Sequence, residues 1–319
     1  MEGTERRVLR VHAKTWEAEG VTSVTLVDPT GADLPAWEPG AHLALQLPGG
    51  LVREYSLCSD PADRSRWTVA VLRKPDSRGG SSLIHDGLPV GTLLEVDGPR
   101  NAFGLDESAS SHVLVAGGIG ITPILAMTRR LAERGAQWTL LYTGRSRSSM
   151  AFLDEISALP GNRVTVHADD EADGGYPDIA GALAELAPDA LVYCCGPESL
   201  MTACADVLGD SKQLRIERFK APDPIAPVGE ESAFDVVLAS TGQRIPVGPD
   251  TSVLAALENA GVPVESSCTE GICGTCEVGV VKGDVDHRDF LLSPDEHATG
   301  STMFPCVSRC RSAELVLDL

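Results

Sequence analysis

The chain has 319 residues, 43% of them hydrophobic, which is enough to bury the cores of two or three domains. Its formal net charge of −20 argues against nucleic acid as a partner, because so acidic a chain repels phosphate backbones. No apolar run is long enough to cross a bilayer, and the opening stretch MEGTERRVLR lacks a signal-peptide pattern, so we expect a cytoplasmic protein that does not contact membranes. Nine cysteines in a reducing compartment favour metal ligation or redox chemistry over disulfides.

Residues 5–108 are predicted to form an antiparallel β-barrel. Short alternating stretches such as HLALQL, WTVAVLR and TLLEVDGP are separated by glycines and prolines. His42 begins the first of these stretches, and its apolar surroundings predict a core histidine rather than a catalytic one.

Two motifs in the predicted barrel suit a flavin phosphate. In REYSLCS, Arg53 can hold a phosphate, Tyr55 can cover an aromatic ring system, and Ser56 follows directly. In RGGSSLIHDGL, residues 79–82 offer backbone N–H groups and hydroxyls at the start of a short helix. Either motif alone occurs often by chance, so the indication rests on the pair.

Residues 109–220 are predicted to form a doubly wound parallel sheet, since strands there alternate with helical stretches. The first strand runs into Gly117, Gly118 and Gly120, and a helix begins near Thr122 and Pro123. Glycines at such a turn let a pyrophosphate approach the positive end of a helix. The turn departs from the G-x-G-x-x-G fingerprint, and no acidic residue follows the second strand to bind a ribose hydroxyl, so an ordinary Rossmann dehydrogenase is not predicted.

Two further stretches lie at strand ends, where open α/β sheets bind ligands. In LYTGRSRSSMAF, Arg145 and Arg147 follow the second strand, where an adenosine phosphate or ribose would lie. In LVYCCGPESLM, Cys195 precedes a Gly-Pro pair, which favours a functional role. Cys194 and Cys204 are predicted to be small buried hydrophobic residues.

A linker is predicted over residues 221–232, because KAPDPIAPVGEES has three prolines and no hydrophobic period. The last domain then covers residues 233–319. Residues 230–319 hold 15 acidic and 5 basic side chains, which gives this part a net charge of −10 and makes it a candidate docking surface for a basic partner.

The last domain contains a cysteine cluster. Cys268, Cys273 and Cys276 have the spacing C-x4-C-x2-C, and Cys306 lies further on, as in plant-type [2Fe–2S] proteins. Gly271 and Gly274 let the backbone approach the sulfurs. The alternative is a zinc site that also uses Cys310, but its usual short cysteine pairs fit this spacing poorly. A short helix capped by Asp250 or Thr251 is predicted before the cluster, and His287 is predicted to be a structural residue near the surface.

The motifs R-x-Y-S, G-G-S, G-G-I-G-I-T-P, C-G-P, E-R-F and C-x4-C-x2-C…C occur in this order along the chain. Over residues 7–318 the chain resembles the phthalate dioxygenase reductase family, to which the reductases of vanillate demethylase and phenoxybenzoate dioxygenase belong. The resemblance implies a multidomain α+β and α/β fold. Its parts are a flavin-binding antiparallel β-barrel, a doubly wound nucleotide domain and a C-terminal β-grasp ferredoxin.

The resemblance also implies FMN rather than FAD as the flavin, and it assigns roles by motif. Catalytic roles fall on Ser56, Thr122 and Cys195. The flavin contacts are Arg53, Tyr55, Ser56, Ala70, Val71, Leu72, Gly79, Gly80, Ser81, Ser82, Thr122 and Phe219. The nicotinamide contacts are Gly117, Gly118, Gly120, Arg145, Cys195 and Pro197. The cluster ligands are Cys268, Cys273, Cys276 and Cys306. Relatives often carry lysine at the position of Leu72, so the charge beside the flavin stays open.

The implied activity is an NAD(P)H-dependent oxidoreductase that passes electrons from NADH to FMN, to the [2Fe–2S] cluster and on to a Rieske-type oxygenase or a cytochrome P450. The alternative is a ferredoxin-like carrier or sensor without NADH turnover. The choice between NADH and NADPH is open at this point, since Arg145 and Arg147 could meet a 2′-phosphate.

Overall fold

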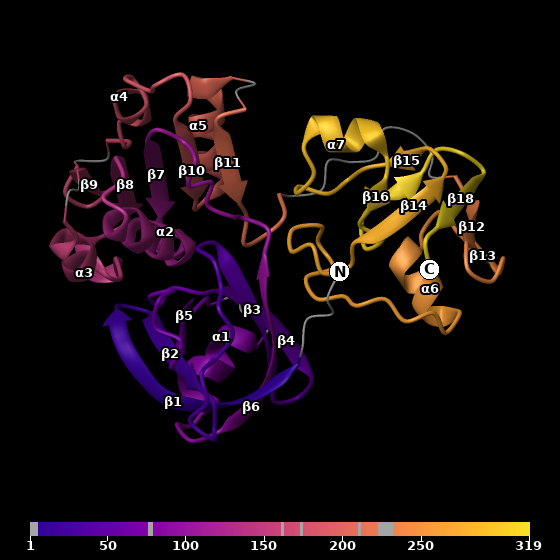
Figure 1. Ribbon diagram of the computed structural model, residues 1–319, viewed down its shortest axis with the longest axis horizontal. Helices are drawn as coiled ribbons and strands as arrows, with labels where there is room; N and C mark the ends of the chain where they lie inside the picture. Colours follow the sequence, from indigo (N-terminus) through magenta and orange to yellow (C-terminus); the bar gives the residue numbers. More distant parts are fainter. Residues whose placement is uncertain (1–5, 76–78, 161–162, 173–174, 210–211, 223–231) are drawn as a thin grey trace. The chain divides into compact units, whose positions relative to one another are not determined.

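The computed structural model describes residues 6–75, 79–160, 163–172, 175–209, 212–222 and 232–319 (Figure 1). The chain divides into two units, residues 1–218 and 219–319. Most of the predicted linker, residues 223–231, lies outside the described residues. Among the described helices, none has the length and apolar character that crossing a membrane requires.

The N-terminal half of the first unit is the predicted antiparallel barrel. Its sheet has the order β4-β3-β6-β1-β2-β5. The strands are β1 (Arg7–Ala18), β2 (Val21–Val27), β3 (Ala41–Leu47), β4 (Leu51–Ser56), β5 (Trp67–Leu72) and β6 (Leu93–Asn101). A bridge between Leu57 and Val69 joins the end of β4 to β5, so the two edges of the sheet meet. The interior is apolar, with Leu43, Leu45 and Trp67 fully buried.

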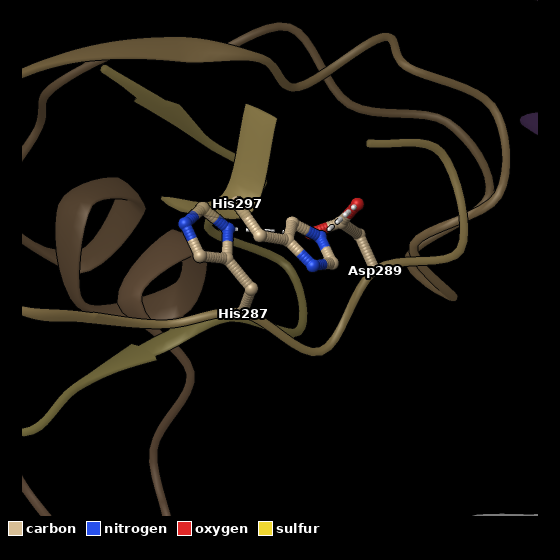
Figure 2. Close-up of side chains that lie close together, drawn as sticks. All are labelled: His287, Asp289 and His297. Atoms are coloured by element: carbon tan, nitrogen blue, oxygen red, sulfur yellow. Dashed lines mark hydrogen bonds and ion pairs between the residues drawn. The ribbon is translucent and has the colours of Figure 1, made fainter. Parts of the chain in front are cut away.

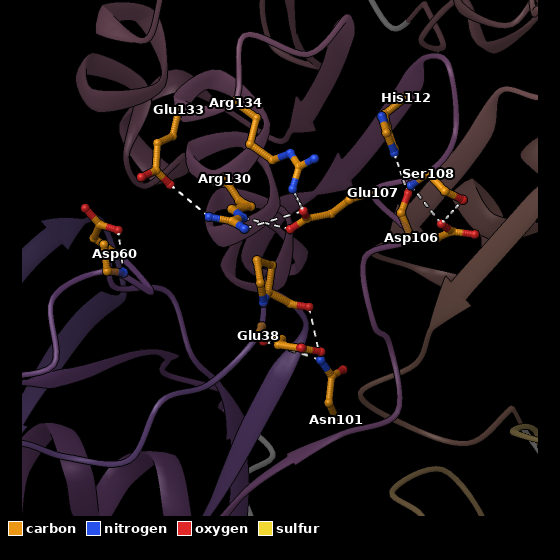
Figure 3. A network of polar contacts seen from close by, with 12 residues as sticks. Glu38, Asp60, Asn101, Asp106, Glu107, Ser108, His112, Arg130, Glu133 and Arg134 are labelled. Carbon is orange, nitrogen blue, oxygen red and sulfur yellow. Dashed lines mark hydrogen bonds and ion pairs between the residues drawn. The ribbon is translucent and has the colours of Figure 1, made fainter.

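The segment between β6 and the next strand fastens the barrel to the following sheet. Glu107 pairs with Arg130 at 2.7 Å and also with Arg134, and the ring of His112 bonds the carbonyl of Asp106 at 2.8 Å (Figure 3). The backbone N–H of Asp106 also donates to the Tyr193 hydroxyl at 2.7 Å. Ala18, Val21 and Ala70 of the barrel also share one apolar core with residues of the sheet such as Leu114, so the barrel and the following sheet form a single unit.

The second half of this unit is a five-stranded parallel sheet of order β11-β10-β7-β8-β9. The strands are β7 (His112–Gly117), β8 (Trp138–Gly144), β9 (Arg163–Ala168), β10 (Leu191–Cys195) and β11 (Leu214–Glu217). The helices are α2 (Ile121–Glu133), α3 (Leu153–Ala158), α4 (Ile179–Ala182) and α5 (Glu198–Leu208).

Alternate residues of β7 serve two different cores, as a doubly wound sheet requires. Leu114 packs with the residues of α2 and α3, whereas Val113 packs with those of α4 and α5. Cys194 and Cys204 lie fully buried in the second of these cores, as predicted. His42, on β3, is 7% exposed, and burial lowers its pKa, so it is the expected core histidine.

The second unit is the predicted ferredoxin-like domain. Its main sheet has the order β13-β12-β18-β14-β16, with β12 and β18 parallel, and a small sheet pairs β15 with β17. The elements are β12 (Phe234–Leu238), β13 (Arg244–Val247), α6 (Val253–Asn259), β14 (Val278–Lys282), β15 (Val285–Asp286), α7 (Pro294–Thr299), β16 (Thr302–Met303), β17 (Arg309–Cys310) and β18 (Glu314–Leu317).

Helix α6 lies before the cysteine loop, as predicted, but its cap differs from the prediction. Ser252, rather than Asp250 or Thr251, is the N-cap residue, and its side chain accepts a hydrogen bond from the Ala255 N–H at 3.1 Å. Ser252 has the extended backbone that an N-cap position needs, and this choice places Val253 and Leu257 in the core. The helix therefore begins one residue later than a cap at Thr251 predicts and two later than a cap at Asp250 predicts.

Candidate functional site

The first candidate anion site lies in the barrel, where β4 meets the short helix α1 (Gly80–Ser82). A Cβ atom at Gly80 would lie 2.6 Å from Cγ of Arg53, so the arginine side chain crosses directly over this glycine. Gly79 has a φ of +89°, which favours glycine, and this conformation turns the chain into the helix. Arg53 and residues 79–82 therefore form one cradle that fits a phosphate group.

The other predicted flavin residues border this cradle on β4 and β5. Ser56 is 4% exposed, and burial raises the pKa of the half-buried Tyr55 to about 12, which keeps its hydroxyl neutral. Ala70 and Val71 are buried in the barrel wall, so any contact they make with a flavin is through backbone atoms or short side chains. Leu72 is partly buried against an apolar core.

The second candidate site lies at the carboxyl ends of β7 and β10, where two glycine-containing turns pack together. A Cβ atom at Gly117 would lie 2.5 Å from Cδ of Pro197, and one at Gly120 would overlap the carbonyl of Cys195. Gly118, in contrast, has a φ of +53° and open space around it. Two of the three glycines are thus needed for the packing of the turns, and Gly118 is the one at which a pyrophosphate could approach.

Three further predicted site residues, Thr122, Arg145 and Phe219, differ in their surroundings. The Thr122 hydroxyl donates to the carbonyl of Ile119 at 3.0 Å, so it closes the first turn of its own helix. Arg145 is exposed after β8. Phe219, predicted beside the flavin, is the first residue of the second unit and is 42% exposed, so its place by the flavin stays a prediction.

Sequence reasoning missed Glu217, which joins two of the predicted catalytic residues. Its Oε2 lies 3.4 Å from the Ser56 hydroxyl and 3.9 Å from Sγ of Cys195. Burial and the neighbouring Glu217 hold the pKa of the Cys195 thiol well above its usual range, and burial raises the pKa of Glu217 to about 8. The signal available in the sequence was the acidic residue itself, Glu217, at the end of a strand in RIERFK. Both groups are therefore neutral at pH 7, where they can position a substrate by hydrogen bonding.

The raised pKa of Glu217 predicts a dependence of stability on pH. Between its usual value of 4.5 and about 8, the folded protein keeps a proton that the unfolded chain has lost, so rising pH favours unfolding. Glutamine at position 217 cannot titrate. As pH rises through this window, the free energy of unfolding of Glu217→Gln should therefore increase relative to that of the native protein, by up to about 1.4 kcal/mol per pH unit. Urea unfolding across the window measures this gain, with exposed Glu185→Gln as the control. A constant difference between Glu217→Gln and the native protein would show that Glu217 is ionised in the fold.

The cysteine loop of the second unit brings four thiols together in two pairs. The sulfurs of Cys268 and Cys273 are within hydrogen-bonding reach of each other, as are those of Cys276 and Cys306. The bond from Cys273, with backbone N–H groups such as that of Glu270 at 3.3 Å, lowers the pKa of Cys268 to about 5. Such donors stabilise the thiolate form that ligates metals.

The arrangement in pairs distinguishes a diiron cluster from zinc. Tetrahedral zinc with bonds of 2.3 Å needs its thiolate sulfurs about 3.8 Å apart. Within the described residues, no three cysteine sulfurs lie within 4.8 Å of one another. Two pairs instead match a [2Fe–2S] cluster, in which each iron takes two thiolates. Cys310 lies apart in the apolar core, with its sulfur 3.0 Å from the Ser312 hydroxyl.

The loop reaches this geometry through strained backbone. Gly271 and Gly274 have φ values of +72° and +80°, and Thr269 has +58°, which is unusual for a residue with a side chain. A Cβ atom at Gly271 would lie 2.7 Å from the side chain of Val307. These conformations turn the chain tightly enough for one loop to supply three ligands.

Comparison with known proteins supports both halves of this description. Residues 236–311 match the model of the 2Fe-2S iron-sulfur cluster binding domain, and residues 114–206 match that of the oxidoreductase NAD-binding domain. Phenoxybenzoate dioxygenase subunit beta of Ectopseudomonas oleovorans is 44% identical over 98% of this chain and 97% of its own length.

Two solved structures extend the comparison to the fold. A structure of phthalate dioxygenase reductase, described as modular for electron transfer from pyridine nucleotides to [2Fe–2S], is 39% identical with a TM-score of 0.71, over 98% of each chain. An intact type IV self-sufficient cytochrome P450 monooxygenase is 42% identical with a TM-score of 0.92, over 98% of this chain and 41% of its own.

The nucleotide domain and the cysteine cluster thus define a pyridine-nucleotide oxidoreductase that carries an iron–sulfur centre. The barrel, the parallel sheet and the ferredoxin domain occur in the predicted order, which confirms the fold class. The chain belongs to the phthalate dioxygenase reductase family, as the motifs indicated. It is an oxygenase reductase, which passes electrons from NADH through a flavin and a [2Fe–2S] cluster.

Proposed function

We propose that this protein binds FMN as its flavin, prefers NADH to NADPH, and delivers single electrons to a separate terminal oxygenase of the Rieske type or to a cytochrome P450. The observation that carries the proposal is the presence of two anion-binding turns and a paired thiolate set on one chain. When bound, the flavin and the cluster would let the two electrons that NADH donates together leave one at a time.

The assignment of residues follows from their positions. Arg53 and residues 79–82 hold the flavin phosphate, while Tyr55 and Ser56 lie further along β4 toward the ring system. Gly118 admits the pyrophosphate of the dinucleotide, and Arg145 contacts its adenosine half. The buried group of Ser56, Cys195 and Glu217 positions the nicotinamide and excludes water from it.

FMN is favoured over FAD because the barrel cradle of Arg53, Ser81 and Ser82 suits a terminal phosphate, and because the family resemblance implies FMN. The domain boundaries proposed are residues 5–108, 109–220 and 233–319. The division of the chain near residue 218 is compatible with the last of these.

Anaerobic titration of the purified protein with NADH tests the function. We expect both the flavin and the cluster absorption to bleach, and cytochrome c to be reduced in the presence of excess NADH. Acid release of the flavin followed by chromatography should give FMN. Absence of bleaching would leave an electron carrier without NADH turnover, and release of FAD would overturn the choice of flavin alone.

The preference for NADH rests on the acids that follow β9. Nε of Arg147 donates to both carboxylate oxygens of Glu171, at 2.8 and 2.9 Å, so this guanidinium already has a carboxylate partner. The backbone N–H groups of Asp169 and Asp170 donate to the carbonyls of Gly144 and Arg145 after β8, where the adenosine is proposed to lie. A 2′-phosphate would therefore approach an acidic segment in which one of the two nearby arginines is already paired.

Glu171→Gln should free Arg147 and raise kcat/KM for NADPH up to about fivefold, the effect expected of one exposed ion pair of roughly 1 kcal/mol. The value for NADH should change little. Glu133→Gln is the matched control, because it breaks a similar exposed pair with Arg130 on α2 (Figure 3). An unchanged NADPH value in Glu171→Gln would show that these acids do not select the nucleotide.

A further inference from the structure

We propose that His287, Asp289 and His297 form a second metal site in the ferredoxin-like unit, one that binds a single zinc-type divalent cation. The three side chains come from the segment after β15 and from α7, and they face one another (Figure 2). One ligand atom from each lies within 4.8 Å of the others. The four cluster cysteines contribute nothing to this set.

Burial distinguishes this group from a chance surface arrangement. The side chain of Asp289 is 0% exposed and that of His287 is 7% exposed. Asp289 Oδ1 and Nδ1 of His287 face each other at 3.6 Å, beyond hydrogen-bonding distance, and neither these atoms nor Nε2 of His287 has a hydrogen-bond partner among the described residues. Unpaired polar atoms at such depth are costly, so they indicate a missing partner with positive charge or hydrogen-bonding capacity.

The other oxygen of Asp289 shows that the carboxylate is fixed in place. Asp289 Oδ2 accepts hydrogen bonds from the backbone N–H groups of Leu291 and Leu292, at 3.2 and 2.9 Å, and lies 3.3 Å from Nε2 of His297. Oδ1 is thereby turned toward His287, whose Nδ1 is 3.6 Å away. A carboxylate oriented by backbone donors with one oxygen left over is the usual arrangement of a metal ligand.

The charges nearby leave room for a cation. The guanidinium groups of Arg288 and Arg311 both bond the carboxylate of Asp286.

The ligand types favour zinc over harder cations. Two imidazole nitrogens and one carboxylate oxygen form a common zinc ligand set, with a fourth position open to water. Bonds of 2.0–2.1 Å place tetrahedral ligand atoms about 3.3 Å apart. The two rings are stacked with centroids 4.4 Å apart and planes at 18°, so binding requires them to turn toward Oδ1.

An ion here would also brace the cluster loop. The backbone N–H of Phe290, next to Asp289, donates to the carbonyl of Gly271 at 3.0 Å. The side chain of Leu291 lies over Gly274. The metal site would therefore tie α7 to a segment that contacts the loop holding three of the cluster cysteines.

Zinc binding to the full chain, loaded with flavin and cluster, tests the proposal. The protein is incubated with zinc chloride and freed of excess, and zinc and iron are then measured per chain. We expect one zinc at unchanged iron content, with a zinc X-ray absorption spectrum showing only nitrogen and oxygen neighbours at about 2.0–2.1 Å. His297→Ala should lose this zinc, whereas exposed His12→Ala should keep it.

Three results would overturn the proposal. The first is no zinc above background in protein with an intact cluster. The second is a shell of sulfur neighbours at about 2.3 Å, which would mean that zinc has replaced iron at the cysteines. The third is full zinc retention in His297→Ala. His297 is partly exposed, with 32% of its side chain accessible, so its replacement by alanine should leave the fold intact.

Discussion

Cys306→Ser is expected to abolish assembly of the [2Fe–2S] cluster, while Cys310→Ser should retain it. The sulfur of Cys306 pairs with that of Cys276, so its loss leaves one iron with a single thiolate and a hydroxyl that binds iron poorly. Iron and acid-labile sulfide per chain, with the visible absorption of the cluster, measure the effect. Reduction of ferricyanide by NADH should persist in Cys306→Ser, because this activity needs only the first unit, whereas reduction of cytochrome c should be lost.

Cys310→Ser is the matched control for the same chemical change. The Cys310 sulfur lies in the core beside the Ser312 hydroxyl and 3.7 Å from the carbonyl of Glu314, so a serine hydroxyl would find acceptors there. We expect a stability cost of about 1 kcal/mol and a full complement of iron. The opposite pattern, with the cluster kept in Cys306→Ser and lost in Cys310→Ser, would overturn the ligand assignment.

The architecture was predictable because its signals are local and periodic. Alternating apolar stretches predicted the barrel, and strand–helix alternation predicted the parallel sheet, in which Leu114 and Val113 indeed face opposite cores. The cysteine spacing predicted a loop that carries three ligands. The N-cap of α6 was predicted one or two residues too early, since Asp250, Thr251 and Ser252 can all cap a helix and only packing chooses among them.

The contacts that define the sites were less predictable, because they join residues far apart in the sequence. Glu217 meets Ser56 across 161 positions, and no local pattern announces that pairing. The glycine pattern of the first turn, predicted to contact a pyrophosphate, did not indicate that Gly117 and Gly120 also pack against the turn after β10. The acids after β9 were not predicted, because they follow the third strand of this sheet along the chain rather than the second. Glycine-rich turns and strand ends thus indicate where a site lies but not which atoms do the work.

Truncation after Ile225 is expected to separate the two activities. The fragment 1–225 should be yellow, and it should reduce ferricyanide with NADH at close to the rate of the full chain, since it includes the whole first unit and Phe219. It should not reduce cytochrome c at a useful rate, because all four cluster cysteines are absent. Flavin content and the two activities, measured side by side, test this. A colourless fragment that is otherwise folded would show that flavin binding needs the ferredoxin-like unit.

The reciprocal fragment 226–319 sharpens the experiment. After cluster assembly it should have the absorption of a [2Fe–2S] protein, because its core is built from its own strands and α6. Mixed with fragment 1–225 at micromolar concentration, it should restore cytochrome c reduction only weakly, since a short linker holds tethered domains at an effective concentration of roughly mM. The restored rate should rise linearly with fragment concentration. Full activity at micromolar concentration would instead reveal a stable complex of the two parts, and residues 221–232 would then not be needed as a tether. The fragment 1–218, which lacks Phe219, completes the series. If Phe219 stacks on the flavin, fragment 1–218 should bind flavin more weakly than fragment 1–225.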